Sequence, residues 1–217
     1  MIKTPLTKTF DELLLAGWSL DSVLADAYRV EFSHFGSGAF TEAEFRRMYT
    51  MPGSLCALLF PPDRIAEPGY ALGIEACVER RSQDGIVAHQ LVTIAIDPAM
   101  TGQGLGLELD NYCEALIVER GYKLRILRSR APSYIYAQYG GRIGGSPHAE
   151  ATRFALKRGF SPMSSEQSLN FFGSDIARLI VDDVIVGDRI LQQCVFAESL
   201  EHENKPPWYF ICMSKEH

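Results

Sequence analysis

The chain has 217 residues, a formal net charge of −6 and 47% hydrophobic residues, a composition that provides for a globular core. The mild negative charge argues against a nucleic-acid-binding protein, which would need a basic face. The sequence has neither an N-terminal apolar leader nor a run of about 18 apolar residues, so we expect no signal peptide, no membrane span and no membrane partner.

The cysteines stand singly inside apolar segments, and none forms a pair with metal-ligand spacing. An odd number of unpaired cysteines is typical of reduced thiols in the cytoplasm. We therefore expect a cytoplasmic protein without a bound metal, in which all five are buried: Cys56, Cys77, Cys113, Cys194 and Cys212.

Residues 1–50 are predicted to be mainly helical. Ile2–Thr7 is a weak candidate for a first strand. From Phe10 to Tyr49, apolar residues recur at three- and four-residue steps, which predicts helices interrupted at Gly36-Ser37-Gly38. Ser19 or Asp21 is a suitable N-cap for one of them.

The helical part also contains a capping box and three side chains that could take part in recognition. Thr41-Glu-Ala-Glu44 has the spacing of a capping box and predicts the start of a further helix. The aromatic side chains Tyr28 and Phe35, together with His34, are expected to serve core and linker packing, with recognition of a substrate as the alternative.

Three strands are predicted next, over Leu55–Phe60, Tyr70–Arg80 and His89–Ile96. The Asp84-Gly85 pair between the last two is a hairpin signal. Alternation within the second strand places Glu75, Cys77 and Glu79 on the face opposite Ile74, Ala76 and Val78. We expect the two glutamates to be solvated, with a place in a substrate groove as the alternative.

A glycine-rich turn follows the third of these strands. Val92–Ile96 is stopped by Asp97-Pro98, three glycines alternate at positions 102, 104 and 106, and an amphipathic helix runs to Arg120. Unpaired N–H groups at a helix start attract anions, and glycines let a phosphate approach the backbone. Leu107-Glu108 stands where a P-loop has Lys-Ser/Thr, and a dinucleotide fingerprint also fails at Leu107.

A second segment, from His148 to Phe160, reads His-Ala-Glu-Ala-Thr-Arg-Phe-Ala-Leu-Lys-Arg-Gly-Phe. Together the two segments resemble the acyl-CoA signature of the GNAT superfamily of N-acetyltransferases. Thr101–Gly106 corresponds to Arg/Gln-x-x-Gly-x-Gly/Ala, and the second segment to Asn-x-x-Ala-x-x-x-Tyr-x-x-x-Gly-Phe. The chain departs from these patterns at Thr101, at His148 in place of Asn, and at Ala155 in place of Tyr.

The resemblance spans about Leu55 to Lys215 and implies an α/β fold of the α+β type. Its central sheet is expected to be mixed and mostly antiparallel, with helices on both faces and a splayed parallel pair formed by the Val92 strand and Lys123–Arg128. We predict a single domain over residues 1–217, with an insertion near the site at residues 131–147.

The resemblance implies an N-acetyltransferase in which a primary amine attacks acetyl-CoA directly within a ternary complex. The alternative is a catalytically weak or inactive module that binds acyl-CoA and regulates or contacts other proteins. The acceptor would be a small-molecule or protein amine, and a homodimer is left open. The expected cofactor-binding residues are Ile94, Ala95, Ile96, Thr101, Gly102, Gln103, Gly104, Leu105, Gly106, Leu107, His148 and Ala151.

Because Ala155 cannot protonate a departing thiolate, another group is expected to act as the catalytic acid or base. His148 is the first candidate, since an imidazole exchanges protons near neutral pH; a role limited to capping its helix is the alternative. Tyr134, Tyr136 and Tyr139 of the insertion are the others. This glycine-rich insertion is either a lid or an ordinary surface loop.

The C-terminal part is predicted to contain one helix and two strands. Asp175–Val186 has apolar residues at helical steps and is expected to be an amphipathic helix. Ile190–Ala197 fits a strand or a helix, with a strand favoured, and Trp208–Met213 is predicted as the last strand.

Overall fold

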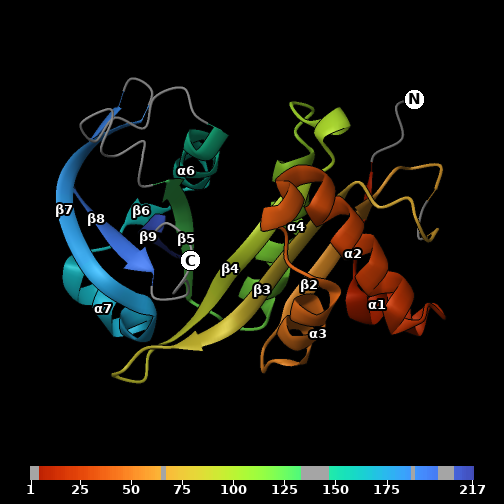
Figure 1. Ribbon diagram of the computed structural model, residues 1–217. Coiled ribbons are helices and arrows are strands. Elements are labelled where there is room, and N and C mark those ends of the chain that lie inside the picture. The colour runs from red at the N-terminus through yellow and green to blue at the C-terminus, as the bar shows by residue number, and fades with distance from the viewer. Residues whose placement is uncertain (1–4, 65–66, 133–146, 187–188, 200–207) are drawn as a thin grey trace. The chain divides into compact units, whose positions relative to one another are not determined.

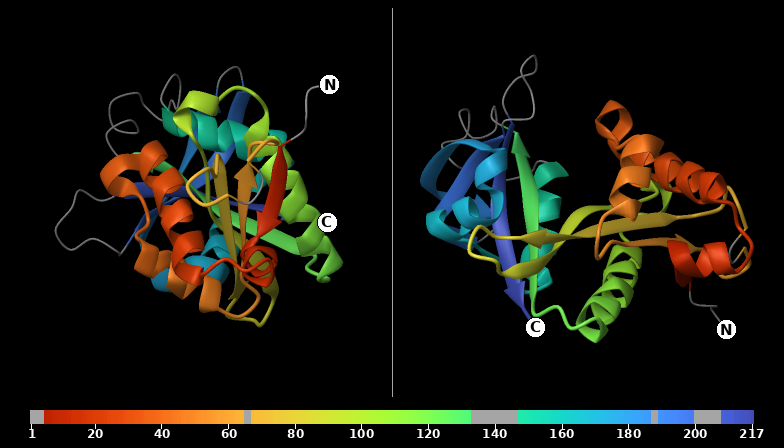
Figure 2. Two further views of the ribbon diagram at one scale, coloured as in Figure 1. Left: turned by 90° about the vertical axis from the view of Figure 1, so that its right-hand side faces the viewer. Right: turned by 90° about the horizontal axis from the view of Figure 1, so that it is seen from below.

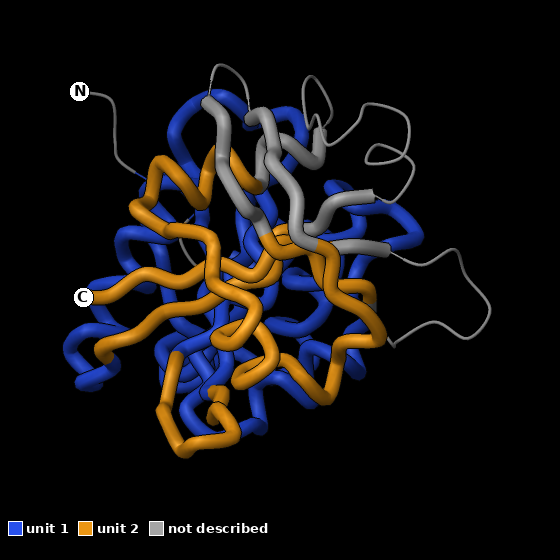
Figure 3. The backbone as a smooth tube through the Cα atoms, turned by 90° about the vertical axis from the view of Figure 1, so that its left-hand side faces the viewer, with its two compact units in different colours: residues 1–79, 89–122 blue, residues 80–88, 123–217 orange. Residues whose placement is uncertain are grey.

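A computed structural model describes residues 5–64, 67–132, 147–186, 189–199 and 208–217. The chain divides into two compact units (Figure 3). Unit 1 consists of Met1–Glu79 and His89–Tyr122, and unit 2 of Arg80–Ala88 and Lys123–His217.

Unit 1 is built on strands β1 to β4, which are neighbours in chain order. β1 pairs antiparallel with β2, and β2 pairs antiparallel with β3. The predicted strand Leu55–Phe60 is confirmed at its bounds, whereas the first strand begins later than expected. The strands are β1 (Leu6–Thr9), β2 (Leu55–Phe60), β3 (Gly73–Arg81) and β4 (Val87–Ile96).

The hairpin between β3 and β4 is also confirmed. The backbone N–H of Ser82 donates to Ile86 O at 2.9 Å and closes the turn. Gly85 adopts a φ of 88° there, a conformation that favours glycine. The Asp84-Gly85 pair therefore predicts the hairpin correctly, because glycine readily adopts the backbone conformation that the turn requires.

The described part of unit 1 also contains four α-helices and two short 3₁₀ turns. The Thr9 hydroxyl accepts from the Glu12 N–H while the Glu12 carboxylate accepts from Thr9 N–H, and Thr41 with Glu44 repeats this reciprocal cap. Ser19 caps the second helix, as predicted. The elements are α1 (Phe10–Leu15), α2 (Leu20–Phe35), η1 (Gly36–Gly38), α3 (Glu42–Thr50), η2 (Pro98–Met100) and α4 (Leu105–Glu119).

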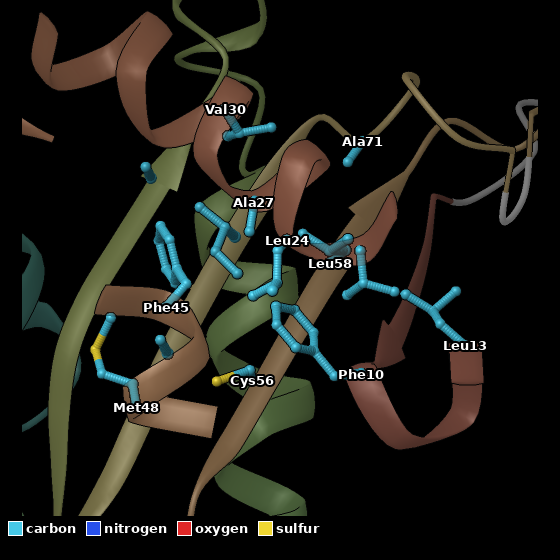
Figure 4. Packing of buried hydrophobic residues seen from close by; sticks show 14 of the residues in the cluster. Phe10, Leu13, Leu24, Ala27, Val30, Phe45, Met48, Cys56, Leu58 and Ala71 are labelled. Carbon is cyan, nitrogen blue, oxygen red and sulfur yellow. The ribbon is translucent and has the colours of Figure 1, made fainter. Parts of the chain in front are cut away.

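The core of unit 1 lies between α1–α3 and one face of its strands. In Figure 4, Leu24, Ala27 and Val30 of α2 pack with Cys56 and Leu58 of β2. Figure 2 shows α4 on the other face of the strands. These strands are thus covered on both faces, and all six residues of β2 are buried.

Glu75 was predicted to be solvated, but it lies on the face of the strands that α4 covers. Its side chain is fully buried, with Cys77 Sγ 3.4 Å from Glu75 Oε1. Glu79, on the same face, is partly buried and accepts from the Tyr122 hydroxyl at 2.9 Å. A Cβ added at Gly73 on this face would lie 2.6 Å from Ile96 Cδ1, so a side chain there would require the Ile96 side chain to shift. The expected solvated position is therefore wrong for Glu75.

The described strands of unit 2 follow the order β5-β9-β8-β7, and β6 pairs with β9 off this path. The strands predicted at Lys123–Arg128 and Trp208–Met213 are confirmed as parts of β5 and β9, which pair antiparallel. Ser164 and Gln167 form a reciprocal cap for α7. The elements are β5 (Leu124–Pro132), α6 (Pro147–Lys157), β6 (Ser161–Pro162), α7 (Ser165–Phe172), η3 (Gly173–Asp175), β7 (Ile176–Val186), β8 (Arg189–Ser199) and β9 (Trp208–Glu216).

The helix predicted at Asp175–Val186 is wrong, because this segment forms strand β7 (Figure 1). β7 pairs antiparallel with β8, with Ile180 opposite Phe196 and Val181 opposite Val195. The segment is rich in isoleucine and valine, which favour strands. Its apolar residues also fit helical steps, but the segment forms a strand because it pairs with β8. The strand favoured at Ile190–Ala197 is confirmed within β8.

The predicted fold class is confirmed: α/β with a mixed, mostly antiparallel sheet and helices. β4 and β5, the strands of the predicted parallel pair, belong to different units. None of the described helices is long and apolar enough to cross a membrane.

Four cysteines are buried free thiols, as predicted: Cys56, Cys77, Cys113 and Cys212. Burial raises the pKa of the Cys56 and Cys212 thiols to about 12. Such thiols are neutral near physiological pH and are poor nucleophiles. The side chain of Cys194 lies outside the described part of the chain.

Candidate functional site

The glycine-rich turn joins η2, just after β4, to the start of α4. Gly102 and Gly104 have φ values of 79° and 81°, in the left-handed region that favours glycine. Thr101 through Gly104 are exposed, and a Cβ added at either glycine would meet no atom within 4 Å. The turn therefore presents its backbone to open space.

The start of α4 has donors available for an anion. Gly104 is its N-cap and has no side chain to satisfy them. Leu107 N–H and Glu108 N–H donate to Gly104 O at 3.0 and 3.1 Å. Within the described residues, no backbone bond is recorded from the N–H groups of 102–106. Together with the positive end of the helix dipole, they suit a phosphate group.

Side chains around the turn fix its conformation. The Thr101 hydroxyl donates to Pro98 O at 2.9 Å, and the Asp97 carboxylate accepts from Ala99 N–H at 3.0 Å. Leu105 is buried and anchors the helix start, whereas Leu107 is exposed. Thr101, at which the chain departs from the GNAT pattern, therefore stabilises the turn through its hydroxyl group.

The predicted cofactor-binding residues of unit 1 lie near one another because they are close in sequence, at the end of β4 and in the glycine-rich turn. Ala95 and Ile96 are buried at the end of β4, and Ile94 is partly buried. The Ile96 carbonyl accepts a hydrogen bond from His34 Nδ1 at 3.0 Å. This histidine, at the end of α2, is exposed, as is Phe35, so neither side chain is part of the core, and their packing in the linker stays a prediction.

Sequence reasoning missed Glu31, a buried carboxyl group that faces β4 from α2. It is 1% exposed, and the Thr93 hydroxyl lies 2.9 Å from Glu31 Oε2. Burial raises the pKa of Glu31 to about 7, although hydrogen bonds from Thr93 and from the Phe40 backbone oppose this. A signal was present, because Glu31 follows Ala27 by four residues on the apolar side of the helix.

In unit 2, the second motif forms α6 and its C-terminal end. Gly159 has a φ of 85°, and Phe160 N–H donates to Ala155 O at 3.0 Å, so the helix ends at Gly-Phe as the resemblance implies. A buried contact of 2.6 Å between Ser129 Oγ and Thr152 Oγ1 ties α6 to β5. Ala155 is 1% exposed.

The remaining predicted site residues are only partly covered by the structure. His148 and Ala151 belong to α6, while their side chains lie outside the described part. Tyr134, Tyr136 and Tyr139, with most of the predicted insertion, also lie outside it. Their predicted roles stay predictions.

No family model and no curated protein matches the sequence. The fold is nevertheless similar to that of solved N-acetyltransferases. The ribosomal-protein-S18-alanine N-acetyltransferase of Escherichia coli has a TM-score of 0.55 and 15% identity, over 98% of this chain and 94% of that chain.

Two further structures give the same result. An aminoglycoside 6′-N-acetyltransferase complexed with coenzyme A has a TM-score of 0.56 and 12% identity, over 97% of this chain and 96% of that chain. A protein from Desulfovibrio desulfuricans assigned to the GNAT family has a TM-score of 0.53 and 12% identity, over 98% and 99% of the two chains. At these identities the likeness concerns the fold, and the predicted GNAT-like fold is confirmed.

Proposed function

We propose, from the GNAT fold of this chain and its open glycine turn, an acyl-CoA-dependent N-acetyltransferase. The pyrophosphate of acetyl-CoA would bind the N–H groups of residues 102–106, and the backbone of Ile94 and Ala95 would lie beside the pantetheine arm. The observation that carries the proposal is the exposed turn with its available donors at the start of α4.

The comparisons support the same proposal from an independent side. The similar structures include N-acetyltransferases, and one of them holds coenzyme A. A strand that runs into a glycine turn and a helix is the part of unit 1 suited to a phosphate-bearing cofactor.

The transfer would proceed by direct attack of the amine on the thioester carbon. The C–N bond forms, the C–S bond breaks, and coenzyme A leaves as a thiolate that takes up a proton. An acyl-enzyme on a cysteine is disfavoured for the four described thiols, because they are buried and the pKa values of two are raised to about 12. Binding both substrates together supplies the orientation that the reaction requires.

His148 is the first candidate for the group that protonates the thiolate or positions the pantetheine arm, followed by Tyr134, Tyr136 and Tyr139. The acceptor would be a small-molecule or protein amine. We place the reaction in the cytoplasm and assign it no metal.

The second candidate function is an acyl-CoA-binding module without turnover. One observation favours it: Ala155, at the position of the family's tyrosine, is buried and has no proton to donate. This candidate shares the cofactor site with the first and differs from it only in chemistry.

A screen for thiol release from acetyl-CoA separates the two functions. The amines would be a polyamine, an aminoglycoside, free amino acids and a lysine-containing peptide, and calorimetry would measure binding of coenzyme A in parallel. Amine-dependent thiol release supports the transferase. Binding without release by any amine supports the binding module, and absence of binding overturns both.

A further inference from the structure

Glu31 and Thr93 form a buried pair between α2 and β4 of unit 1. The Thr93 hydroxyl donates to both carboxylate oxygens of Glu31, at 3.1 Å to Oε1 and 2.9 Å to Oε2. A hydroxyl that donates its proton keeps the lone pairs of its oxygen. The Thr93 oxygen can therefore accept a hydrogen bond from an N–H group while its own proton points at Glu31.

This pair lies where the proposed path of the cofactor ends. With the pyrophosphate on residues 102–106, the pantetheine arm runs back along β4 from Ile96 and passes Ile94. An extended arm is roughly 15 Å long and spans about four to five strand residues, since a strand rises about 3.3 Å per residue. Counted from Ile96, the thioester comes to the level of Val92 and Thr93.

The edge of β4 gives a ligand access to this level. Among the described strands of unit 1, β4 is the last in the order and adjoins β3. Val92 and Ile94, which flank Thr93 along the strand, are partly exposed, whereas Thr93 is 6% exposed. An amine that meets a thioester beside this edge comes within reach of the Thr93 hydroxyl, and Glu31 lies directly behind it.

Glu31 has the acidity of a base that works near neutral pH. Burial raises its pKa to about 7, while hydrogen bonds from Thr93 and from the Phe40 backbone lower it. Within the described residues, no charged side chain contributes to this shift. A carboxylate with this pKa takes up a proton at pH 7 more readily than an ordinary glutamate does.

The titratable groups on the elements around Glu31 are bound to other partners. On α2, the Asp26 carboxylate pairs with an arginine of the same helix at 3.1 Å, and His34 Nδ1 lies 3.0 Å from a backbone carbonyl oxygen. On β4, His89 Nε2 lies 2.8 Å from another backbone carbonyl oxygen, and Glu44 closes the cap of α3. In the described part of the chain, none of them forms a recorded hydrogen bond or ion pair with Glu31.

We propose that Thr93 and Glu31 relay the proton that the attacking amine loses, an assignment that rests on the proposed transferase function. As the C–N bond forms, the amine nitrogen gives a proton to Thr93 Oγ1, and the hydroxyl proton of Thr93 passes to the Glu31 carboxylate. The C–S bond breaks, and the thiolate leaves with the electron pair and is protonated by a separate group or by water. After the products leave, the relay runs in reverse and returns the proton to water.

The test uses substitutions that keep the shape of both side chains, with the best alkylamine of the thiol-release screen. Glu31→Gln keeps an oxygen acceptor for Thr93 but cannot take up the proton, and Thr93→Val removes the hydroxyl. We expect kcat/KM to fall about a hundredfold in each variant, the size of a general-base contribution. Calorimetric affinity for coenzyme A should be nearly unchanged, which also shows that the variants fold.

Two control variants accompany this test. Thr93→Ser retains the hydroxyl group and should keep most of the rate. Glu42→Gln removes an exposed carboxylate at the start of α3 and should keep the original rate. A loss in Thr93→Ser as large as that in Thr93→Val would mean that packing, and not the hydroxyl, is required, and would overturn the relay.

Two further measurements separate a relay from a structural contact. Methoxyamine is a weak base that needs little help in losing its proton, so Glu31→Gln should slow its acetylation less than about tenfold. With the alkylamine, kcat/KM of the unaltered chain should fall as the pH falls through about 7, where Glu31 takes up a proton. This limb of the pH profile should disappear in Glu31→Gln, while the limb set by the amine itself, at higher pH, remains.

The outcomes distinguish the relay from the function on which it rests. An unchanged rate of Glu31→Gln with the alkylamine would overturn the relay. Equal losses with both amines would make the pair a structural contact and overturn the relay as well. In both cases the transferase function would stand. Absence of turnover by the unaltered chain with every amine would overturn the transferase function and the relay together.

Discussion

The Thr93 hydroxyl of β4 lies 2.9 Å from a carboxylate oxygen of Glu31 on α2, and both side chains are buried. This contact joins a helix of the N-terminal part to the strand that leads into the glycine turn. Because burial raises the pKa of Glu31 from 4.5 to about 7, its carboxyl group stays protonated in the folded chain over a pH range in which the unfolded chain ionises it.

The first prediction is a loss of stability as the pH rises. The stabilising contribution is fully present below the unfolded pKa of 4.5 and is lost as the pH rises through about 7. At about 1.4 kcal/mol per pKa unit, the loss amounts to roughly 3 kcal/mol by pH 8. Glu31→Gln removes this ionisation, so urea denaturation should show the variant gaining stability relative to the original chain between pH 5 and pH 8.

Glu42→Gln serves as the matched control, because Glu42 is exposed at the start of α3. Its free energy of unfolding relative to the original chain should change little over the same range. If Glu31→Gln and Glu42→Gln gave the same pH dependence, Glu31 would be ionised in the folded chain, contrary to the prediction.

The second prediction concerns the glycine turn. Gly104→Val adds a branched side chain at a φ of 81° on the face where the phosphate is proposed to bind, and should weaken the binding of coenzyme A at least several-fold in calorimetry. Gly121→Val, at a φ of 85° just beyond the other end of α4 and also in open space, imposes similar backbone strain. An affinity loss shared by both variants would point to general destabilisation and count against the phosphate site.

The third prediction concerns Ala155. Introducing a tyrosine there, as in the GNAT pattern that the segment resembles, should lower stability by about 1–3 kcal/mol, because the Ala155 side chain is 1% exposed and a phenol would overpack its surroundings. Thermal unfolding would measure this loss. Arg153→Tyr, exposed on the same helix, should be nearly neutral. A stable Ala155→Tyr variant with faster thiol release would instead mean that the position opens toward the cofactor.

The fourth prediction concerns His148 in the first turn of α6. If it protonates the thiolate, His148→Ala should lower kcat about a hundredfold with little change in the affinity for coenzyme A. If it only positions pantetheine, His148→Asn should keep its activity, because asparagine is the family's residue. Steady-state kinetics of the two variants distinguish these roles.

Features decided by neighbouring residues could be predicted from the sequence. The Thr41–Glu44 cap, the Asp84-Gly85 hairpin and the glycine turn depend on a few adjacent residues, and each is found where it was expected. Their geometry follows from local φ values and local hydrogen bonds.

Features decided by distant partners could not be predicted in the same way. Strand β7 became a strand through its pairing with β8, although its apolar spacing also fits a helix. Alternation placed Glu75 on the correct face, but only the packing of α4 makes that face buried. The hydrogen bond of His34 pairs it with Ile96, which lies 62 positions further along the chain.

The reciprocal helix caps differ in chemistry between the two units. Those of α1 and α3 are closed by Glu12 and Glu44, whereas that of α7 is closed by Gln167, whose amide does not titrate in acid. Hydrogen bonds from the Thr9 backbone, Lys8 and Tyr112 outweigh partial burial and lower the pKa of Glu12 to about 2, so its cap survives until strongly acidic conditions. Below that pH, protonation weakens Glu12 as an acceptor at the start of α1, whereas the Gln167 amide at the start of α7 is unchanged. Acid should therefore fray the start of α1 first, and its backbone amides would exchange with solvent before those of α7.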